Sequence, residues 1–200
     1  MLFGETGFNP HKVMSTEYIR EEHKKISPEA YNNNSILDGV GNKIGWVLEE
    51  LLQVFRPDLT RENTFNHDFV TPYGTVDAKA KWVNKGGWPR EDWAATVYDT
   101  SKHQTADYYI FGRVYVKIDN LGENYFPYGY ICGGILREEF HDIGTHYNRG
   151  DREGDNGYKI TDPCTNVRLD QLRPIAELEG NIVSPEKEEN EEENWIAENL

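Results

Sequence analysis

Residues 67–79, HDFVTPYGTVDAK, constrain the fold more than any other segment of this 200-residue chain. Apolar and β-branched residues flank a Pro-Tyr-Gly turn, which predicts two short antiparallel strands. A loop over residues 72–73, or over 71–74, gives the same register and sets Asp68 opposite Asp77. Strand side chains alternate between the two faces, so Lys79 points the same way as Asp77.

Two opposed carboxylates need a charge between them. Opposed strand residues have Cβ atoms roughly 4.5–5.5 Å apart, so Asp68 and Asp77 repel unless a proton or a cation separates them. A hard divalent cation such as Mg²⁺ suits them, because it accepts carboxylate oxygens and keeps several waters. On these residues alone an ordinary solvated hairpin remains the alternative, because Asp-x-Lys occurs by chance in many chains.

The pattern resembles the active site of PD-(D/E)xK nucleases: Asp68, eight residues, then Asp77-Ala78-Lys79, with His67 where the family name has Pro. The resemblance implies a metal-dependent DNA endonuclease that hydrolyses phosphodiester bonds to a 5′-phosphate and a 3′-hydroxyl. Asp68, Asp77 and the Ala78 carbonyl would hold Mg²⁺, with Mn²⁺ as a substitute. Lys79 would position or activate the attacking water.

An amphipathic helix is expected over residues 36–55, ending before Pro57. Its apolar positions recur at helical spacing: Ile44, Leu48, Leu51 and Phe55. Related nucleases often carry a metal-facing Glu on the corresponding helix. Glu49 lies at the edge of the apolar stripe and Glu50 lies across the helix, so we choose Glu49. A solvated helix acid is the alternative for Glu49.

Downstream segments complete the expected core. Residues 106–118 are rich in β-branched and aromatic residues, which predicts a long central strand covered on both faces. Residues 128–134 predict a further strand, and residues 135–140 predict the start of a helix. Residues 165–175 resemble the end of such nuclease domains, so the resemblance covers residues 36–178.

Three polar residues are candidate substrate contacts. Lys81 shares the face of Asp77 and Lys79, where it would bind a DNA phosphate or remain solvated. His103 and Gln104 precede the long strand, where they either reach the hairpin or form an ordinary polar loop. A basic stripe for DNA is also expected, and it would comprise Lys79, Lys81, Lys85, Arg90, Lys102 and Arg113.

These patterns predict an α/β fold with a mixed central β-sheet flanked by helices, a restriction-endonuclease-like core. We expect an N-terminal extension over residues 1–34, with a helix near 15–25. The nuclease-like domain would span 35–180, and an acidic, disordered tail 181–200. Double-strand cleavage usually needs two active sites, so the resemblance allows a homodimer.

The net charge of −14 is unusual for a DNA-binding protein, because phosphate contacts need Lys and Arg. Part of the excess is local, since the chain from Glu186 onward holds seven Glu and one Lys. This tail either solubilises the protein or, through Trp195, Ile196 and Leu200, docks on a protein partner or on the DNA groove. The acidity leads to a second hypothesis beside the nuclease. The chain would then be a non-catalytic acidic interaction protein on the same fold, which mimics DNA or binds a partner.

Several classes of protein are not indicated by the sequence. No apolar run is long enough for a membrane span, and the first residues lack the pattern of a signal peptide. Cys132 and Cys164 are expected to be free thiols in a reducing cytoplasm. The resemblance implies that this is the cytoplasm of a bacterial or phage-infected cell. No Cys/His spacing predicts zinc, and neither a phosphate-binding Gly-rich loop nor a nucleophile elbow is present.

Overall fold

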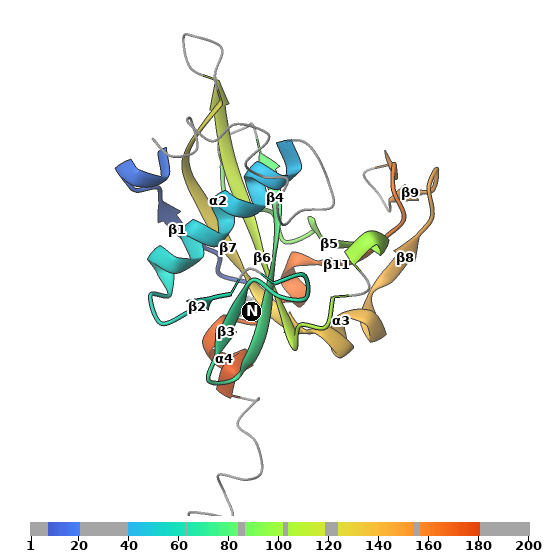
Figure 1. Cartoon of the computed structure of the whole chain (residues 1–200). Helices are drawn as coiled ribbons and strands as arrows, with labels where there is room; N and C mark the ends of the chain where they lie inside the picture. The colour runs from blue at the N-terminus through green and yellow to red at the C-terminus, as the bar shows by residue number, and fades with distance from the viewer. Residues whose placement is uncertain are drawn as a thin grey trace, which may run out of the picture.

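The structure is a computed structural model that describes residues 8–20, 40–62, 64–83, 87–101, 104–118, 124–153 and 157–180. Within this part of the chain a six-stranded mixed sheet forms the centre of the molecule (Figure 1). In spatial order its strands are β1 (His11–Met14), β7 (Asn124–Leu136), β6 (Tyr108–Ile118), β4 (Gly74–Val83), β3 (Phe69–Thr71) and β2 (Thr60–Arg61). Neighbouring strands are antiparallel except β4 and β6, which are parallel.

Two smaller sheets lie beside the central one in Figure 1. A three-stranded sheet has the order β5 (Ala94–Tyr98), β11 (Cys164–Arg168) and β8 (Thr145–Tyr147). A two-stranded sheet pairs β9 (Arg152–Glu153) with β10 (Tyr158–Lys159). The helices are α2 (Val40–Phe55), α3 (Arg137–Ile143) and α4 (Ile175–Gly180), with short 3-10 turns η2 (Asp99–Ser101) and η3 (Leu169–Gln171).

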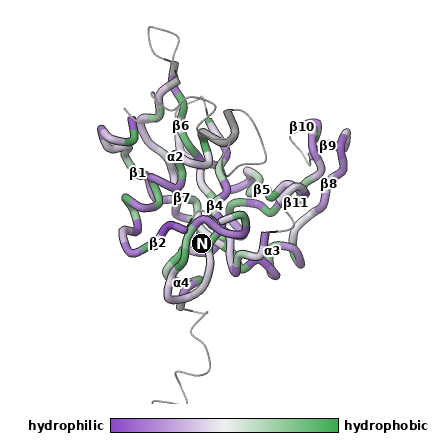
Figure 2. The backbone as a smooth tube through the Cα atoms, in the orientation of Figure 1, coloured by the Kyte–Doolittle hydropathy of each residue, from purple (hydrophilic) through white to green (hydrophobic). Residues whose placement is uncertain are grey.

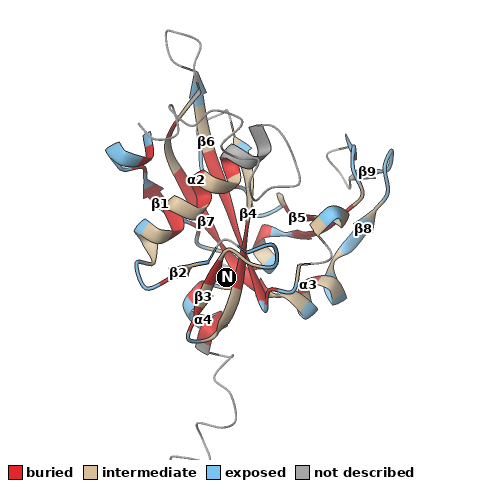
Figure 3. Ribbon diagram, viewed as in Figure 1, coloured by how far each residue is buried: buried red, intermediate tan, exposed pale blue. Residues whose placement is uncertain are grey.

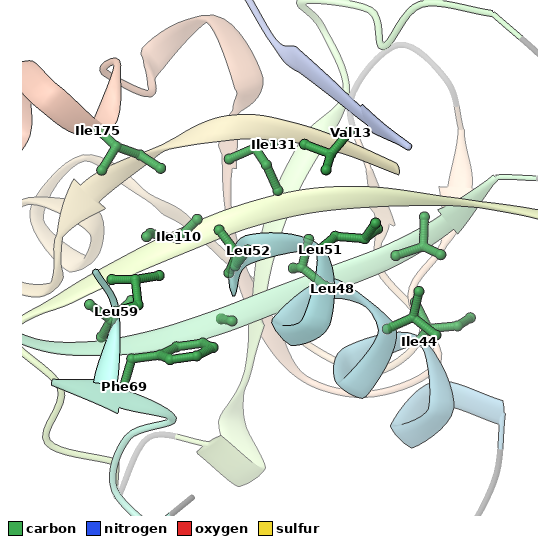
Figure 4. Close-up of a cluster of buried hydrophobic side chains, with 14 of the residues drawn as sticks. Val13, Ile44, Leu48, Leu51, Leu52, Leu59, Phe69, Ile110, Ile131 and Ile175 are labelled. Atoms are coloured by element: carbon green, nitrogen blue, oxygen red, sulfur yellow. The ribbon is translucent and has the colours of Figure 1, made fainter. Parts of the chain in front are cut away.

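Helix α2 packs on one face of the central sheet, as its apolar periodicity predicted. Its buried side chains are Ile44, Val47, Leu48, Leu51 and Leu52, and they meet Ile110 of β6 and Ile131 of β7 (Figure 4). The helix ends where the chain reaches Pro57, which cannot continue it. The first four residues of the predicted helix, 36–39, lie outside the described residues.

Two glycines let α2 approach the sheet closely. A Cβ atom added at Gly112 would lie 2.1 Å from Leu48 Cδ1, and one added at Gly129 would lie 2.6 Å from Leu51 Cδ1. Gly112 on β6 and Gly129 on β7 therefore leave space above the sheet, and Leu48 and Leu51 fill it. The glycine floor (Gly112 and Gly129) fixes how high α2 sits above the sheet.

The predicted central strand over 106–118 is confirmed as β6, and it is covered on both faces. Tyr108, Ile110 and Val114 belong to the core under α2, whereas Tyr109 and Phe111 belong to a second core on the other face. Figure 3 shows the middle of the central strands as buried. Figure 2 shows hydrophilic residues gathering along β8, β9 and β10 instead.

The mixed α/β class is confirmed, but much of the second face is covered by a sheet rather than by helices. Helices α2 and α4 line the first core, and α3 contributes Phe140 to the second. The three-stranded sheet supplies Ala95, Val97 and Val167 to that second core. Residues 94–98 and 164–168 each contain β-branched residues, which favour strands, and the two segments pair with each other.

The structure also differs from the expected elements near the end of β7 and at the N-terminal side of the sheet. The predicted helix over 135–140 begins two residues later, because Ile135 and Leu136 still pair with β6 as the end of β7. Strand β1, which the sequence pattern did not indicate, adds an edge to the sheet by pairing with β7. Of the predicted helix near 15–25, residues 17–20 are helical and residues 21–25 lie outside the described residues, as does the tail 181–200.

We expect Gly112→Ala to destabilise the protein by roughly 1–3 kcal/mol, because the new methyl group overlaps Leu48. Gly45→Ala on α2 is the matched control, since a Cβ atom there meets nothing within 4 Å. That control should gain up to about 1 kcal/mol from helix propensity. Urea denaturation of both variants measures the difference, and equal stabilities would contradict the glycine floor.

Candidate functional site

The hairpin of β3 and β4 is fixed by polar contacts at its turn. Thr71 pairs with Gly74, so the loop is Pro72-Tyr73, one of the two lengths expected. Gly74 has φ +131°, and a Cβ atom there would lie 2.7 Å from Asp107 Oδ2. That same oxygen accepts hydrogen bonds from Thr75 N (2.7 Å) and Thr75 Oγ1 (2.8 Å). Asp107 therefore ties the turn to the start of β6.

The register of the hairpin brings Asp68 beside Asp77. Phe69 pairs with Val76, and Asp68 N donates to Val76 O at 2.8 Å as the ladder ends. The Asp68 carboxylate then turns toward β4, where its Oδ2 accepts a hydrogen bond from the Ala78 N–H at 2.7 Å. The predicted register is confirmed, and Asp68 is held by backbone atoms of the strand that carries Asp77.

Asp77 and Lys79 form a buried ion pair. Asp77 is 2 % exposed, and its Oδ2 lies 2.6 Å from Lys79 Nζ. Among the described residues this oxygen accepts no hydrogen bond of good angle, so the contact is an ion pair rather than a directed bond. Lys79 Nζ also donates to Gln104 Oε1 at 2.7 Å, and Gln104 Nε2 donates to Phe65 O at 3.3 Å. Gln104, a predicted substrate contact, thus holds Lys79.

Glu49 reaches the hairpin from α2. Its carboxylate is close enough to Asp68 and Asp77 for their charges to raise its pKa. Arg61 of β2 lies between the two helix acids, with Nη2 3.5 Å from Glu49 Oε2 and Nη1 2.6 Å from Glu50 Oε1. Of the two candidate acids, the structure therefore places Glu49 among the hairpin carboxylates and gives Glu50 a closer partner in Arg61.

The pKa values of Glu49, Asp77 and Asp68 are all raised. Burial raises the pKa of Glu49 to about 8, and the charge of Asp68 adds to the rise, whereas Arg61 lowers it. Burial raises the pKa of Asp77 to about 7 against the lowering effect of Lys79. Burial also raises the pKa of Asp68, although the Ala78 N–H lowers it. All three acids resist ionisation unless a cation comes to them.

The donor set suits a cation that needs few protein ligands. Among the described residues no group of three or more His, Cys, Asp or Glu is close enough to hold a metal ion. Asp68 and Asp77 are a pair, with Glu49 farther out and Lys79 against Asp77. Mg²⁺ is bound through one or two carboxylates and keeps several waters, so a pair of aspartates fits it.

Other predicted residues lie elsewhere or outside the described part. His103, Lys85 and Lys102 are not among the described residues. Lys81 is partly buried on β4, beyond Lys79. Arg113 cannot belong to a surface stripe, because it is 3 % exposed and its Nη2 donates to Ala94 O at 2.6 Å.

Arg61 is the residue of the site that the sequence reasoning missed. It lies on a strand of two residues, Thr60–Arg61, which is too short for any periodic pattern. An available signal was the surplus of acid: with Glu49, Glu50 and two aspartates converging, a basic residue is required nearby. Arg61 is the basic residue between the helix and the hairpin that meets this need.

Comparison of the chain with protein-family models, with curated proteins and with solved structures finds no match. In the described part of the chain, no helix is both long and apolar enough to cross a membrane.

The metal-free protein should lose stability as the pH rises from about 4 to 8. An acid whose pKa is raised by folding stays protonated in the folded state while the unfolded chain ionises, so the unfolded state gains. Glu49→Gln should reduce this loss by about 2 kcal/mol or more, since one pKa unit corresponds to about 1.4 kcal/mol. Glu177→Gln, at an exposed position of α4, is the control. Unfolding midpoints in EDTA across this pH range measure the effect, and identical curves for the two variants would contradict it.

Proposed function

We propose that this chain is a Mg²⁺-dependent DNA endonuclease of the PD-(D/E)xK type. The observation that carries the proposal is the convergence of Asp68, Asp77, Lys79 and Glu49, which come from three elements, at one end of the hairpin. A scaffold without chemistry gains nothing from burying carboxylates that repel one another. The mixed sheet with a helix on the hairpin agrees with the restriction-endonuclease-like core that we propose for it.

Asp68 and Asp77 would hold the metal, with the Ala78 carbonyl as a further oxygen ligand. When bound, Mg²⁺ or Mn²⁺ polarises the scissile phosphate and lowers the pKa of its bound water. Asp68 stays aimed at the site because the Ala78 N–H fixes its carboxylate. Glu49 would orient the bound ion or bind a second one. Arg61 lies 3.5 Å from Glu49 and reduces the repulsion between Glu49 and the hairpin carboxylates.

Lys79 is the residue placed to act on the attacking water. Its Nζ lies between Asp77 Oδ2 and Gln104 Oε1, at 2.6 and 2.7 Å, so the ammonium group is held in one position. A fixed cation beside the scissile phosphate positions the water and stabilises the charge that develops on the phosphate. Gln104 acts here as a positioning residue for Lys79, because it contacts the lysine and not the hairpin carboxylates.

The decisive test is cleavage of supercoiled plasmid and of single-stranded DNA with Mg²⁺ or Mn²⁺. Asp77→Ala and Lys79→Ala should each reduce the rate by about 100-fold or more, as for loss of a group that stabilises developing charge. Exposed Lys117→Ala and Asp142→Asn are controls that remove the same charges elsewhere. Absence of cleavage by the wild-type protein with both metals on both substrates would favour the acidic interaction protein instead.

Neighbouring acids on α2 offer a finer test. Glu49→Gln should slow cleavage roughly 10- to 100-fold and raise the Mg²⁺ concentration needed, because Glu49 lies with the hairpin carboxylates. Glu50→Gln should stay near the wild-type rate, because Glu50 is paired with Arg61. Rates measured over a Mg²⁺ titration compare the two, and the reverse order of effects would assign the role to Glu50.

A further inference from the structure

A second charged cluster lies farther along the face of β4 that carries Asp77 and Lys79. Lys81 is the next residue on that face, roughly 6.6 Å beyond Lys79 at the strand rise of about 3.3 Å per residue. Its direct neighbour across the parallel ladder is Arg113 of β6. Like charges on adjacent strands destabilise a sheet unless an opposite charge joins them. This pair is therefore opposite in charge to the aspartate pair, of which β4 carries one member, Asp77.

Arg113 is buried, and Lys81 is partly buried. Arg113 is fixed by its bond to Ala94 O, and its guanidinium lies 5.8 Å from the centre of the Trp93 ring. Burial, together with the charge of Arg113, lowers the pKa of Lys81 to about 8. Arg113 stays protonated in proteins, so it supplies a permanent positive charge behind Lys81.

One acid offsets the pair only in part. Glu153 of β9 is close enough to raise the pKa of both Lys81 and Arg113. The Glu153 Oε1 atom also accepts a hydrogen bond from Asn166 Nδ2 at 2.5 Å, so the Glu153 carboxylate interacts with Asn166 as well as with the two cations. Among the groups that these contacts identify, two cations face one carboxylate, and the cluster is left with a net positive charge.

The neighbouring sheet supplies polar atoms with unused capacity. Asn166 of β11 is 8 % exposed and lies opposite Thr96 of β5, which is 7 % exposed. Asn166 Oδ1 and Thr96 Oγ1 are buried without a hydrogen-bond partner among the described residues. Buried polar atoms are normally paired. Of these two, only the Thr96 hydroxyl could donate to an anion, because an amide oxygen such as Asn166 Oδ1 accepts hydrogen bonds.

We infer that Lys81 and Arg113, with Glu153 and Asn166 at their side, form a phosphate site for the DNA strand next to the scissile bond. The inference rests on the proposed function. Lys81 lies on the face of β4 that carries Asp77 and Lys79, so a phosphate bound there would belong to the DNA strand that the proposed nuclease cleaves. Lys81 makes the contact, and buried Arg113 strengthens it through its field. A phosphate there balances the two cations in the way that a metal ion balances the two aspartates.

The test is binding of a fluorescently labelled DNA duplex, measured by anisotropy over a range of salt concentrations. Ca²⁺ replaces Mg²⁺ in the assay because it fills oxygen sites with looser geometry, and a gel confirms that the duplex stays intact. Lys81→Gln should weaken binding roughly tenfold and reduce the slope of log K against log salt by about 0.9. Glu153→Gln should strengthen binding, because it removes a competing negative charge and keeps the bond to Asn166.

Matched variants separate the contact from general charge. Exposed Lys117→Gln and Glu138→Gln remove the same charges away from the cluster and should leave affinity and slope unchanged. Lys81→Arg keeps the charge and should retain most of the affinity, which covers the case in which Lys81→Gln fails to fold. Equal binding by Lys81→Gln and Lys117→Gln would overturn the phosphate site.

Failure of this site and failure of the nuclease give different results. Cleavage that needs Asp77 but proceeds with unchanged KM in Lys81→Gln would reject the phosphate site and retain the nuclease. Binding that depends on Lys81, with no cleavage by the wild-type protein, would reject the nuclease and retain an anion site. Absence of any DNA binding by the wild-type protein would reject both.

Discussion

Three acids with little access to water meet at one place in this molecule, where Asp77 is buried and Asp68 and Glu49 are partly buried. Asp68, Asp77 and Glu49 come from separate segments, and burial raises the pKa of each, while the charge of Asp68 adds to the rise for Glu49 and Asp77. Two basic side chains keep the arrangement folded: Lys79 pairs with Asp77, and Arg61 lies beside Glu49. A buried ion pair rarely adds net stability over an apolar pair, but losing one partner destabilises the fold strongly, because the other charge is then left buried and unpaired.

The hairpin could be predicted because its cause is local. Turn residues and two-residue alternation fix the register, and the register alone sets Asp68 beside Asp77. The helix and the central strand were equally accessible, since each carries its own apolar period. The choice of Glu49 over Glu50 followed from the position of the apolar stripe, and the structure puts Glu49 on the side of the hairpin.

What the sequence could not supply are the contacts between distant segments. The three-stranded sheet joins residues 94–98 to 164–168, and no local pattern predicts which short strands pair. Strand β1 at the sheet edge and Arg61 on a two-residue strand were missed for the same reason. Arg113 was misplaced because a basic residue in a strand gives no sign of which face, or how deep a layer, will receive it.

The glycine floor under α2 has a consequence for chemistry as well as for packing. Leu48, which rests on Gly112, is followed directly by Glu49, so the height of the helix above the sheet also sets how far that carboxylate reaches toward the hairpin. A few tenths of an ångström in the core therefore become a change in the spacing of charges at the site. The proposed cation site would therefore change its affinity when a substitution under α2 shifts the helix relative to the sheet.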